Sequence, residues 1–195
     1  MSTLAPTPRL YFDFVDPLSF LLEREVSAAE SALDVVVARV GVEVNPPPRP
    51  LSDPGDSVWT DRWAQASALA KELEIELEEP RLVPWSRKAH ELLLHAESAG
   101  SGAEVRRAIF HAFFLEGRDI GRVDVLVGLA REAGLDTTES KAVLDVDRYS
   151  AEVSERRDAA VASGVDTVPL VVSGARSLEG FHNRASLSTF LRGSS

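Results

Sequence analysis

The residues best suited to chemistry lie between Asp16 and Ser19, where a carboxylate and a hydroxyl stand three positions apart. The preceding stretch, Leu10 to Val15, is apolar and aromatic with partial alternation, which predicts a short β-strand. After Pro17 the apolar positions recur at helical spacing. A strand therefore leads directly into a helix, with Asp16 at the junction and Ser19 in the first helical turn.

Asp16 has two interpretations at this stage. Asp is a favoured N-cap residue and Pro is favoured at the first helical position, so the side chain would accept a backbone N–H from Leu18 or Ser19. Such a cap contributes about 1 kcal/mol and needs no chemistry to explain it. The second interpretation makes Asp16 and Ser19 candidate catalytic residues, and both interpretations stay open.

Composition limits the function classes. The 195 residues are 44% apolar and include no cysteine, which excludes disulfides and thiol chemistry by the chain itself. The net charge of −10 argues against nucleic acid or an anionic membrane as a partner. No run approaches the roughly 18 apolar residues of a membrane span, and no signal peptide precedes the first strand, so we expect a cytoplasmic location.

The order of the remaining elements predicts the fold class. Prolines at 46–50 interrupt regular structure after a second predicted strand. The elements expected around them are a helix at 17–31, a strand at 33–40, helices across 58–144, a helix at 147–163, strands at 169–172 and 176–179, and a helix at 185–191. This order predicts an α/β, thioredoxin-like fold, with residues 1–56 and 145–195 forming one domain and 57–144 an inserted all-helical domain.

The Asp16 junction and the later segment Gly164 to Val172 together resemble the DsbA family of thioredoxin-fold proteins. This family includes FrnE-like oxidoreductases, 2-hydroxychromene-2-carboxylate isomerases and the related kappa-class glutathione transferases. The resemblance covers nearly the whole chain. Redox members of the family carry a Cys-Pro-x-Cys motif at this junction. By the resemblance, Asp16 takes the place of the first cysteine and Ser19 that of the second.

That replacement bears on activity. Neither Asp16 nor Ser19 can exchange a disulfide, so thiol–disulfide exchange is expected to be lost. In the isomerases and transferases a serine at this position stabilises the thiolate of bound glutathione. A carboxylate about 4 Å from that thiolate would repel it by roughly 4 kcal/mol at an effective dielectric near 20. Glutathione as a cofactor would therefore depend on Ser19 or a backbone N–H.

The resemblance also implies ligand contacts elsewhere in the chain. Pro169 should be cis and face Asp16, with the backbone N–H and C=O of Val168 offered to a peptide or glutathione. Pro17 is a further predicted ligand contact. Trp85 stands where relatives have Asn before a Ser or Thr, so it is expected to wall the cleft as an aromatic surface. The other predicted ligand contacts are Ser86, Phe181 and His182; Ser86 and Asn183 also fit simple helix N-caps.

No metal site is expected, because the four histidines lack ligand spacing. The sequence predicts a DsbA-like protein without redox cysteines that binds glutathione, a peptide or a small ligand between its two domains. One alternative is a glutathione-dependent isomerase or transferase. Another is a non-catalytic structural module that forms a homodimer.

Overall fold

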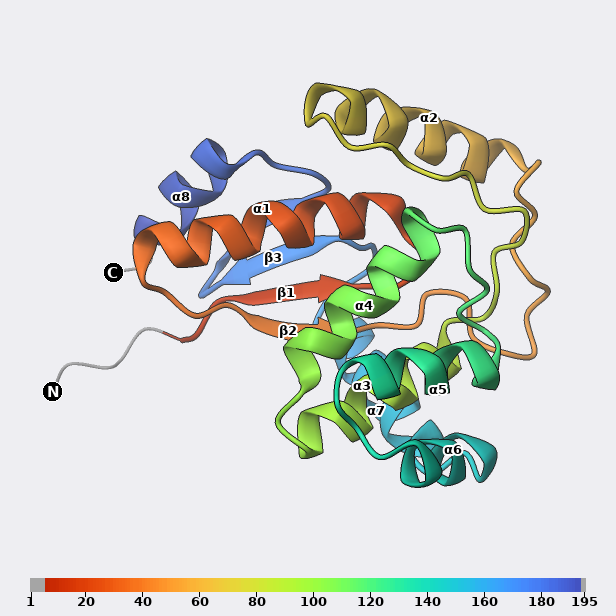
Figure 1. Cartoon of the computed structure of the whole chain (residues 1–195). Helices are drawn as coiled ribbons and strands as arrows, with labels where there is room; N and C mark the ends of the chain where they lie inside the picture. The colour runs from red at the N-terminus through yellow and green to blue at the C-terminus, as the bar shows by residue number, and fades with distance from the viewer. Residues whose placement is uncertain (1–5, 194–195) are drawn as a thin grey trace, which may run out of the picture.

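The computed structural model describes residues 6–193 (Figure 1). Its elements follow the predicted order of β-α-β, a helical block, and α-β-β-α. They are β1 (Arg9–Phe12), α1 (Pro17–Leu33), β2 (Ala38–Gly41), α2 (Ser57–Glu72), α3 (Arg87–Ser98), α4 (Gly102–Phe114), α5 (Val123–Glu132), α6 (Thr137–Asp145), α7 (Ser150–Ala162), β3 (Leu170–Ser173), β4 (Arg176–Glu179) and α8 (Arg184–Arg192). The α/β thioredoxin-like prediction is confirmed.

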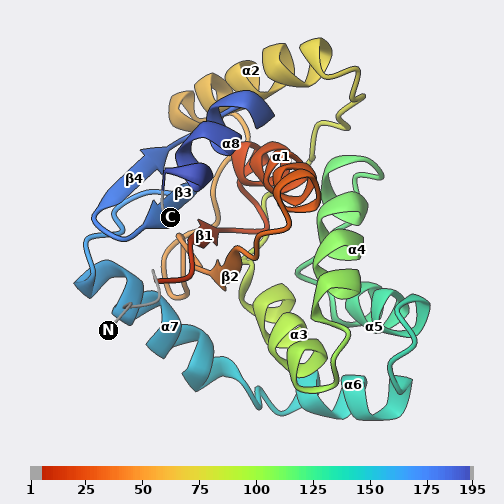
Figure 2. The ribbon, with the colours of Figure 1, turned by 90° about the vertical axis from the view of Figure 1, so that its left-hand side faces the viewer.

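The four strands form one mixed sheet in the order β2-β1-β3-β4. β1 pairs in parallel with β2 and antiparallel with β3, and β4 closes the edge antiparallel to β3. Helices α1 and α8 cover one face, and α7 lies on the other side (Figure 2). Successive strand residues point to opposite faces of the sheet. Leu10 and Val171 pack on the face covered by α1 and α8, whereas Tyr11 and Leu170 pack on the face toward α7.

Two predicted strand boundaries are wrong. The first strand ends at Phe12 instead of Val15, because the chain turns at 13–15 to bring Asp16 to the start of α1. The second begins at Ala38 instead of Leu33, because α1 continues through Leu33 and ends where Asp34 adopts a left-handed conformation with φ 53°. Of the intervening apolar residues, Val37 is buried and Val35 is partly buried in the cluster on the α1 side of the sheet, whereas Val36 is exposed.

The largest core joins the first strand and helix to the helical block. Phe12, Phe14 and Phe20 lie in one buried cluster with Phe110 and Phe114 of α4. The helices predicted as an inserted domain therefore share a hydrophobic core with the sheet half; the division at 57–144 stays a prediction about chain organisation.

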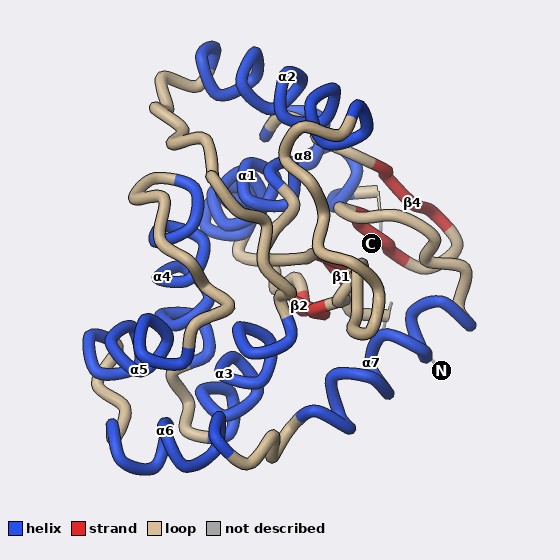
Figure 3. Tube along the Cα trace, turned by 90° about the vertical axis from the view of Figure 1, so that its right-hand side faces the viewer, coloured by secondary structure: helices blue, strands red, loops and turns tan. Residues whose placement is uncertain are grey.

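Helix α2 stands apart from the rest of the helical block. In Figures 1 and 3 it lies next to α1, on the opposite side from α3, α5 and α6. Only Ala66 and Ala70 of this helix are fully buried. Arg62, in the second turn of α2, contacts Asp16 at the start of α1. Within residues 6–193 no helix is both long and apolar enough to cross a bilayer.

Candidate functional site

Asp16 is the N-cap of α1, as predicted. Its Oδ2 accepts hydrogen bonds from the backbone N–H of Ser19 at 2.6 Å and from the Ser19 hydroxyl at 2.5 Å. Pro17 occupies the first helical turn, where its missing N–H costs no intrahelical bond. The carboxylate and the hydroxyl thus bond to each other, and the single hydroxyl hydrogen of Ser19 is already donated.

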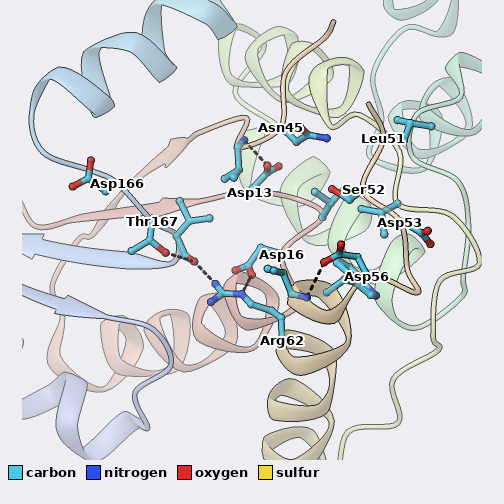
Figure 4. A pocket seen from close by; sticks show the side chains of 16 residues that line it. Asp13, Asp16, Asn45, Leu51, Ser52, Asp53, Asp56, Arg62, Asp166 and Thr167 are labelled. Carbon is cyan, nitrogen blue, oxygen red and sulfur yellow. Dashed lines mark hydrogen bonds and ion pairs between the residues drawn. The ribbon is translucent and has the colours of Figure 1, made fainter. Parts of the chain in front are cut away.

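Arg62 of α2 supplies a second partner to Asp16. Its Nε lies 2.6 Å from Asp16 Oδ1, and its Nη2 donates to the backbone carbonyl of Val168 (Figure 4). One guanidinium therefore links three segments that are distant in sequence: the start of α1, the second turn of α2 and the loop before β3.

The bond between Val168 and Pro169 is cis, as predicted. The shared contact with Arg62 also places this loop next to Asp16, as the resemblance implies. The Val168 carbonyl already accepts a hydrogen bond from Arg62. A carbonyl oxygen has two lone pairs, so the expected contact of Val168 with a ligand stays a prediction.

Burial and charge act in opposite directions on Asp16. Removal from water raises the pKa of this carboxyl, and the Arg62 charge and the hydrogen bonds from Arg62 and Ser19 lower it, with burial the larger effect. Asp16 is only 9% exposed. A buried carboxylate with one cationic partner depends strongly on that partner for its stability.

A second buried carboxylate, Asp13, lies beside this network. Its Oδ2 accepts the Val44 N–H at 2.8 Å, and its Oδ1 lies 3.1 Å from His90 Nε2. His90 packs so closely on β2 that a Cβ at Gly41 would lie 2.4 Å from its Nδ1. Asp13 and His90 thus join β1, the segment after β2 and α3. Among residues 6–193, no group of three or more His, Asp or Glu side chains is arranged to hold a metal ion.

Asp13, Asp16, Arg62 and Val168 line a cavity of about 520 Å³. In Figure 4, Asp16 and Arg62 lie between Thr167, in the loop before β3, and Asp56, in the segment that leads into α2. Small-molecule sites occupy roughly 300–1,000 Å³, so the cavity has a suitable size. Its lining residues are Asp13, Val15, Asp16, Val44, Asn45, Leu51, Ser52, Asp53, Asp56, Val58, Trp59, Arg62, Val83, Asp166, Thr167 and Val168.

The structure separates Trp85 and Ser86 from this cavity. Trp85 lines a different hollow with Arg87 and Lys88, and its indole N–H donates to the Arg49 carbonyl at 3.0 Å. Ser86 stands at the N-cap position of α3, but its hydroxyl makes no capping bond there. Arg87 in this second hollow pairs with the buried carboxylate of Glu43.

The two predicted contacts before α8 also lie away from the cavity lining. Phe181 packs against two hydrophobic clusters, and His182 Nε2 lies 3.0 Å from the Glu179 carbonyl. Asn183 caps α8 by accepting the Ser186 N–H at 3.0 Å, which confirms its simpler interpretation. Of the predicted site residues, the structure brings together Asp16, Ser19, Pro17, Val168 and Pro169.

Sequence reasoning missed Arg62, although a signal was present. Arg62 follows Trp59 by three positions and precedes Ala66 by four, which places it on the same face of the helix as these apolar residues. A charged residue on an apolar helix face usually has a buried partner. That pattern predicts a carboxylate opposite Arg62, and Asp16 is that carboxylate.

A sheet with this topology, a cis proline before β3 and a capped helix after β1 define a thioredoxin-like protein of the DsbA type. The family described as the DSBA-like thioredoxin domain matches residues 9–192, and the chain belongs to it. The uncharacterised protein YwbO of Bacillus subtilis is 31% identical over 145 residues, which are 72% of each chain.

Solved structures share the fold at lower identity. A probable DsbA oxidoreductase from Streptomyces coelicolor aligns with a TM-score of 0.82 and 21% identity, over 96% of this chain and 89% of its own. A 2-hydroxychromene-2-carboxylate isomerase aligns with a TM-score of 0.79 and 19% identity, over 96% and 94%. The cytosolic disulfide reductase DsbM from Pseudomonas aeruginosa, solved with GSH, aligns with a TM-score of 0.73 and 17% identity, over 96% and 98%.

Proposed function

We propose that this DsbA-like protein has lost thiol–disulfide exchange and binds a peptide or small ligand in the cavity beside Asp16 and Arg62. The bridge from Asp16 through Arg62 to the Val168 carbonyl carries this proposal. It puts a carboxylate–guanidinium pair where redox relatives have thiols, and it borders a cavity of ligand size. The proposed location is cytoplasmic.

Glutathione is the second candidate ligand. In its favour, Arg62 is a cation in the cavity wall with 30% of its side chain exposed. Against a glutathione-dependent isomerase or transferase, the Ser19 hydroxyl donates its one hydrogen to Asp16 and has none for a thiolate. We therefore favour binding without thiolate chemistry. The third candidate, a homodimeric structural module, predicts a dimer whose stability no ligand changes.

Two assays test the proposal. In reduction of insulin by dithiothreitol, we expect a rate equal to the protein-free blank. In thermal unfolding, glutathione, short peptides and small aromatic acids and amines are compared, and we expect at least one class to raise Tm. Reduction above the blank would contradict the loss of exchange, and a flat Tm for every class would contradict ligand binding.

A matched pair of variants tests whether the ligand binds in this cavity. Val44 lines the cavity and is 47% exposed, so Val44→Trp should obstruct the mouth and abolish the ligand-induced rise in Tm. Val36 is 74% exposed and lies outside the lining, so Val36→Trp should keep it. Equal effects of the two substitutions would place the ligand elsewhere.

A further inference from the structure

We infer that the cavity binds a peptide-like ligand with a free, protonated amino group, a carbonyl oxygen and an apolar side chain. The inference rests on the proposed function and names the ligand class for the same site. Three independent properties of the cavity support it. They are its apolar lining, the Nη1 group of Arg62, which has no hydrogen-bond partner in the described residues, and carboxylates that have no cationic partner there.

The apolar residues of the cavity lining are the reason to infer an apolar side chain on the ligand. Seven of the lining residues are hydrophobic, and they come from the end of β1, the segment after β2, the start of α2 and the two loops that flank the cavity. They are Val15, Val44, Leu51, Val58, Trp59, Val83 and Val168. An apolar ligand body gains affinity by removing such surface from water.

A free donor group on Arg62 is the reason to infer a carbonyl oxygen on the ligand. Its Nε and Nη2 donate to Asp16 and Val168, and its Nη1 has no partner among residues 6–193. These two contacts fix the guanidinium plane, and Arg62 lines the cavity, so we infer that Nη1 is the donor available to a ligand. Because Asp16 already balances the Arg62 charge, a neutral carbonyl is a suitable acceptor and a carboxylate gains little.

The carboxylates of Asp53, Asp56 and Asp166 are the reason to infer a protonated amino group on the ligand. The lining holds five aspartates and one arginine. Asp53 and Asp56 each use Oδ1 to accept a backbone N–H, from Gly55 and Val58 respectively, and their Oδ2 atoms have no partner in the described part of the chain. Asp166 has no hydrogen-bond or ion-pair partner within residues 6–193. A cavity with this charge attracts a cation and repels an anion such as glutathione.

Four probes that share one aromatic body test the inference. They are phenylalaninamide, neutral N-acetylphenylalaninamide, anionic N-acetylphenylalanine, and 2-phenylethylamine, which lacks the carbonyl. Binding is followed through the indole ¹⁵N–¹H signals, because Trp59 lines this cavity whereas Trp85 lines another hollow. Phenylalaninamide should shift the Trp59 signal and bind about tenfold more tightly than either acetylated probe. 2-Phenylethylamine should also bind more weakly, since it offers Arg62 no acceptor.

We expect a charge-removed variant to keep the fold. In Asp53→Asn/Asp56→Asn/Asp166→Asn, the Asn side chains still accept the Gly55 and Val58 N–H groups, and Asn is as good an N-cap as Asp. Phenylalaninamide affinity should fall about tenfold in this variant, while the affinity for N-acetylphenylalaninamide stays unchanged. Asp61→Asn is the matched control, because Asp61 is exposed on α2 outside the lining.

Several outcomes would overturn the inference. They are equal or tighter binding of either acetylated probe, equal binding of 2-phenylethylamine, an equal loss in Asp61→Asn, or no shift of Trp59 with any of the four probes. If glutathione or an acetylated probe shifts Trp59 and phenylalaninamide does not, the cavity binds ligands and only the inferred class fails. If neither these probes nor the wider ligand screen produces a response, the proposed function fails as well.

Discussion

Arg62→Met is expected to lower the free energy of unfolding by about 2 kcal/mol at pH 7. The substitution leaves the carboxylate of Asp16 buried without its cationic partner, and breaking a buried pair costs roughly 3–5 kcal/mol. The Arg62 side chain is 30% exposed, so solvent screening weakens the pair, and we expect a loss below this range, of about 2 kcal/mol. Urea unfolding followed by circular dichroism measures the change.

This loss should shrink as the pH falls. Burial already raises the pKa of Asp16 above its usual 3.8, and removal of Arg62 takes away an opposing effect. A carboxyl whose pKa is raised on folding lowers stability as the pH rises from the unfolded pKa through the folded one. Below 3.8, Asp16 is protonated in both states and the ion pair no longer contributes. A loss that is constant from pH 3 to pH 7 would contradict this account.

Arg62→Lys is the matched control for charge. Lysine keeps the positive charge near Asp16 but lacks the planar fork that reaches Asp16 and the Val168 carbonyl together. We expect about half of the loss seen in Arg62→Met. A lysine variant as unstable as the methionine variant would show that the geometry of the fork matters more than the charge.

Asp16→Cys/Ser19→Cys is expected to create thiol–disulfide exchange in a chain that contains no cysteine. The first thiol would sit at the N-cap of α1, next to the Arg62 guanidinium and the cis proline loop. A helix N-terminus and an adjacent cation both lower the pKa of a thiol and increase its thiolate fraction at neutral pH. The variant should form an intramolecular disulfide and reduce insulin at least tenfold faster than the parent protein.

A second cysteine pair provides the control. Asp136 caps α6 by accepting the Glu139 N–H at 2.7 Å, which repeats the local arrangement of Asp16 and Ser19. Asp136→Cys/Glu139→Cys therefore has the same spacing at a helix start, without Arg62 or the cis proline loop. It should form a disulfide but reduce insulin far more slowly. Equal rates for the two pairs would show that the surroundings of Asp16 contribute nothing to exchange.

The sequence predicted most of the secondary structure because the apolar periodicity is strong where helices pack on the sheet. The error at Leu33 arose because Leu33, Val35 and Val37 are apolar for another reason: they cover the α1 side of the core while the chain leaves the helix. Strand propensity alone does not distinguish that role from a strand.

The site was only half predictable. Asp16 follows from its position between a predicted strand and a predicted helix, whereas Val168 and Pro169 follow from the resemblance to the DsbA family. The opposite wall, including Leu51 and Asp53, comes from an irregular segment whose path no local pattern determines. Contacts between segments far apart in the chain, such as that of Arg62 with Asp16, depend on tertiary packing.

A double-mutant cycle tests the central claim most directly, namely that Asp16 and Arg62 act as one unit across the cleft. The free energy of unfolding is measured for the parent protein, Asp16→Asn, Arg62→Met and the double variant. Asn retains the cap but removes the charge. We predict a coupling of at least about 1 kcal/mol, so that Arg62→Met costs far less when combined with Asp16→Asn. Effects that add to within about 0.5 kcal/mol would contradict the claim.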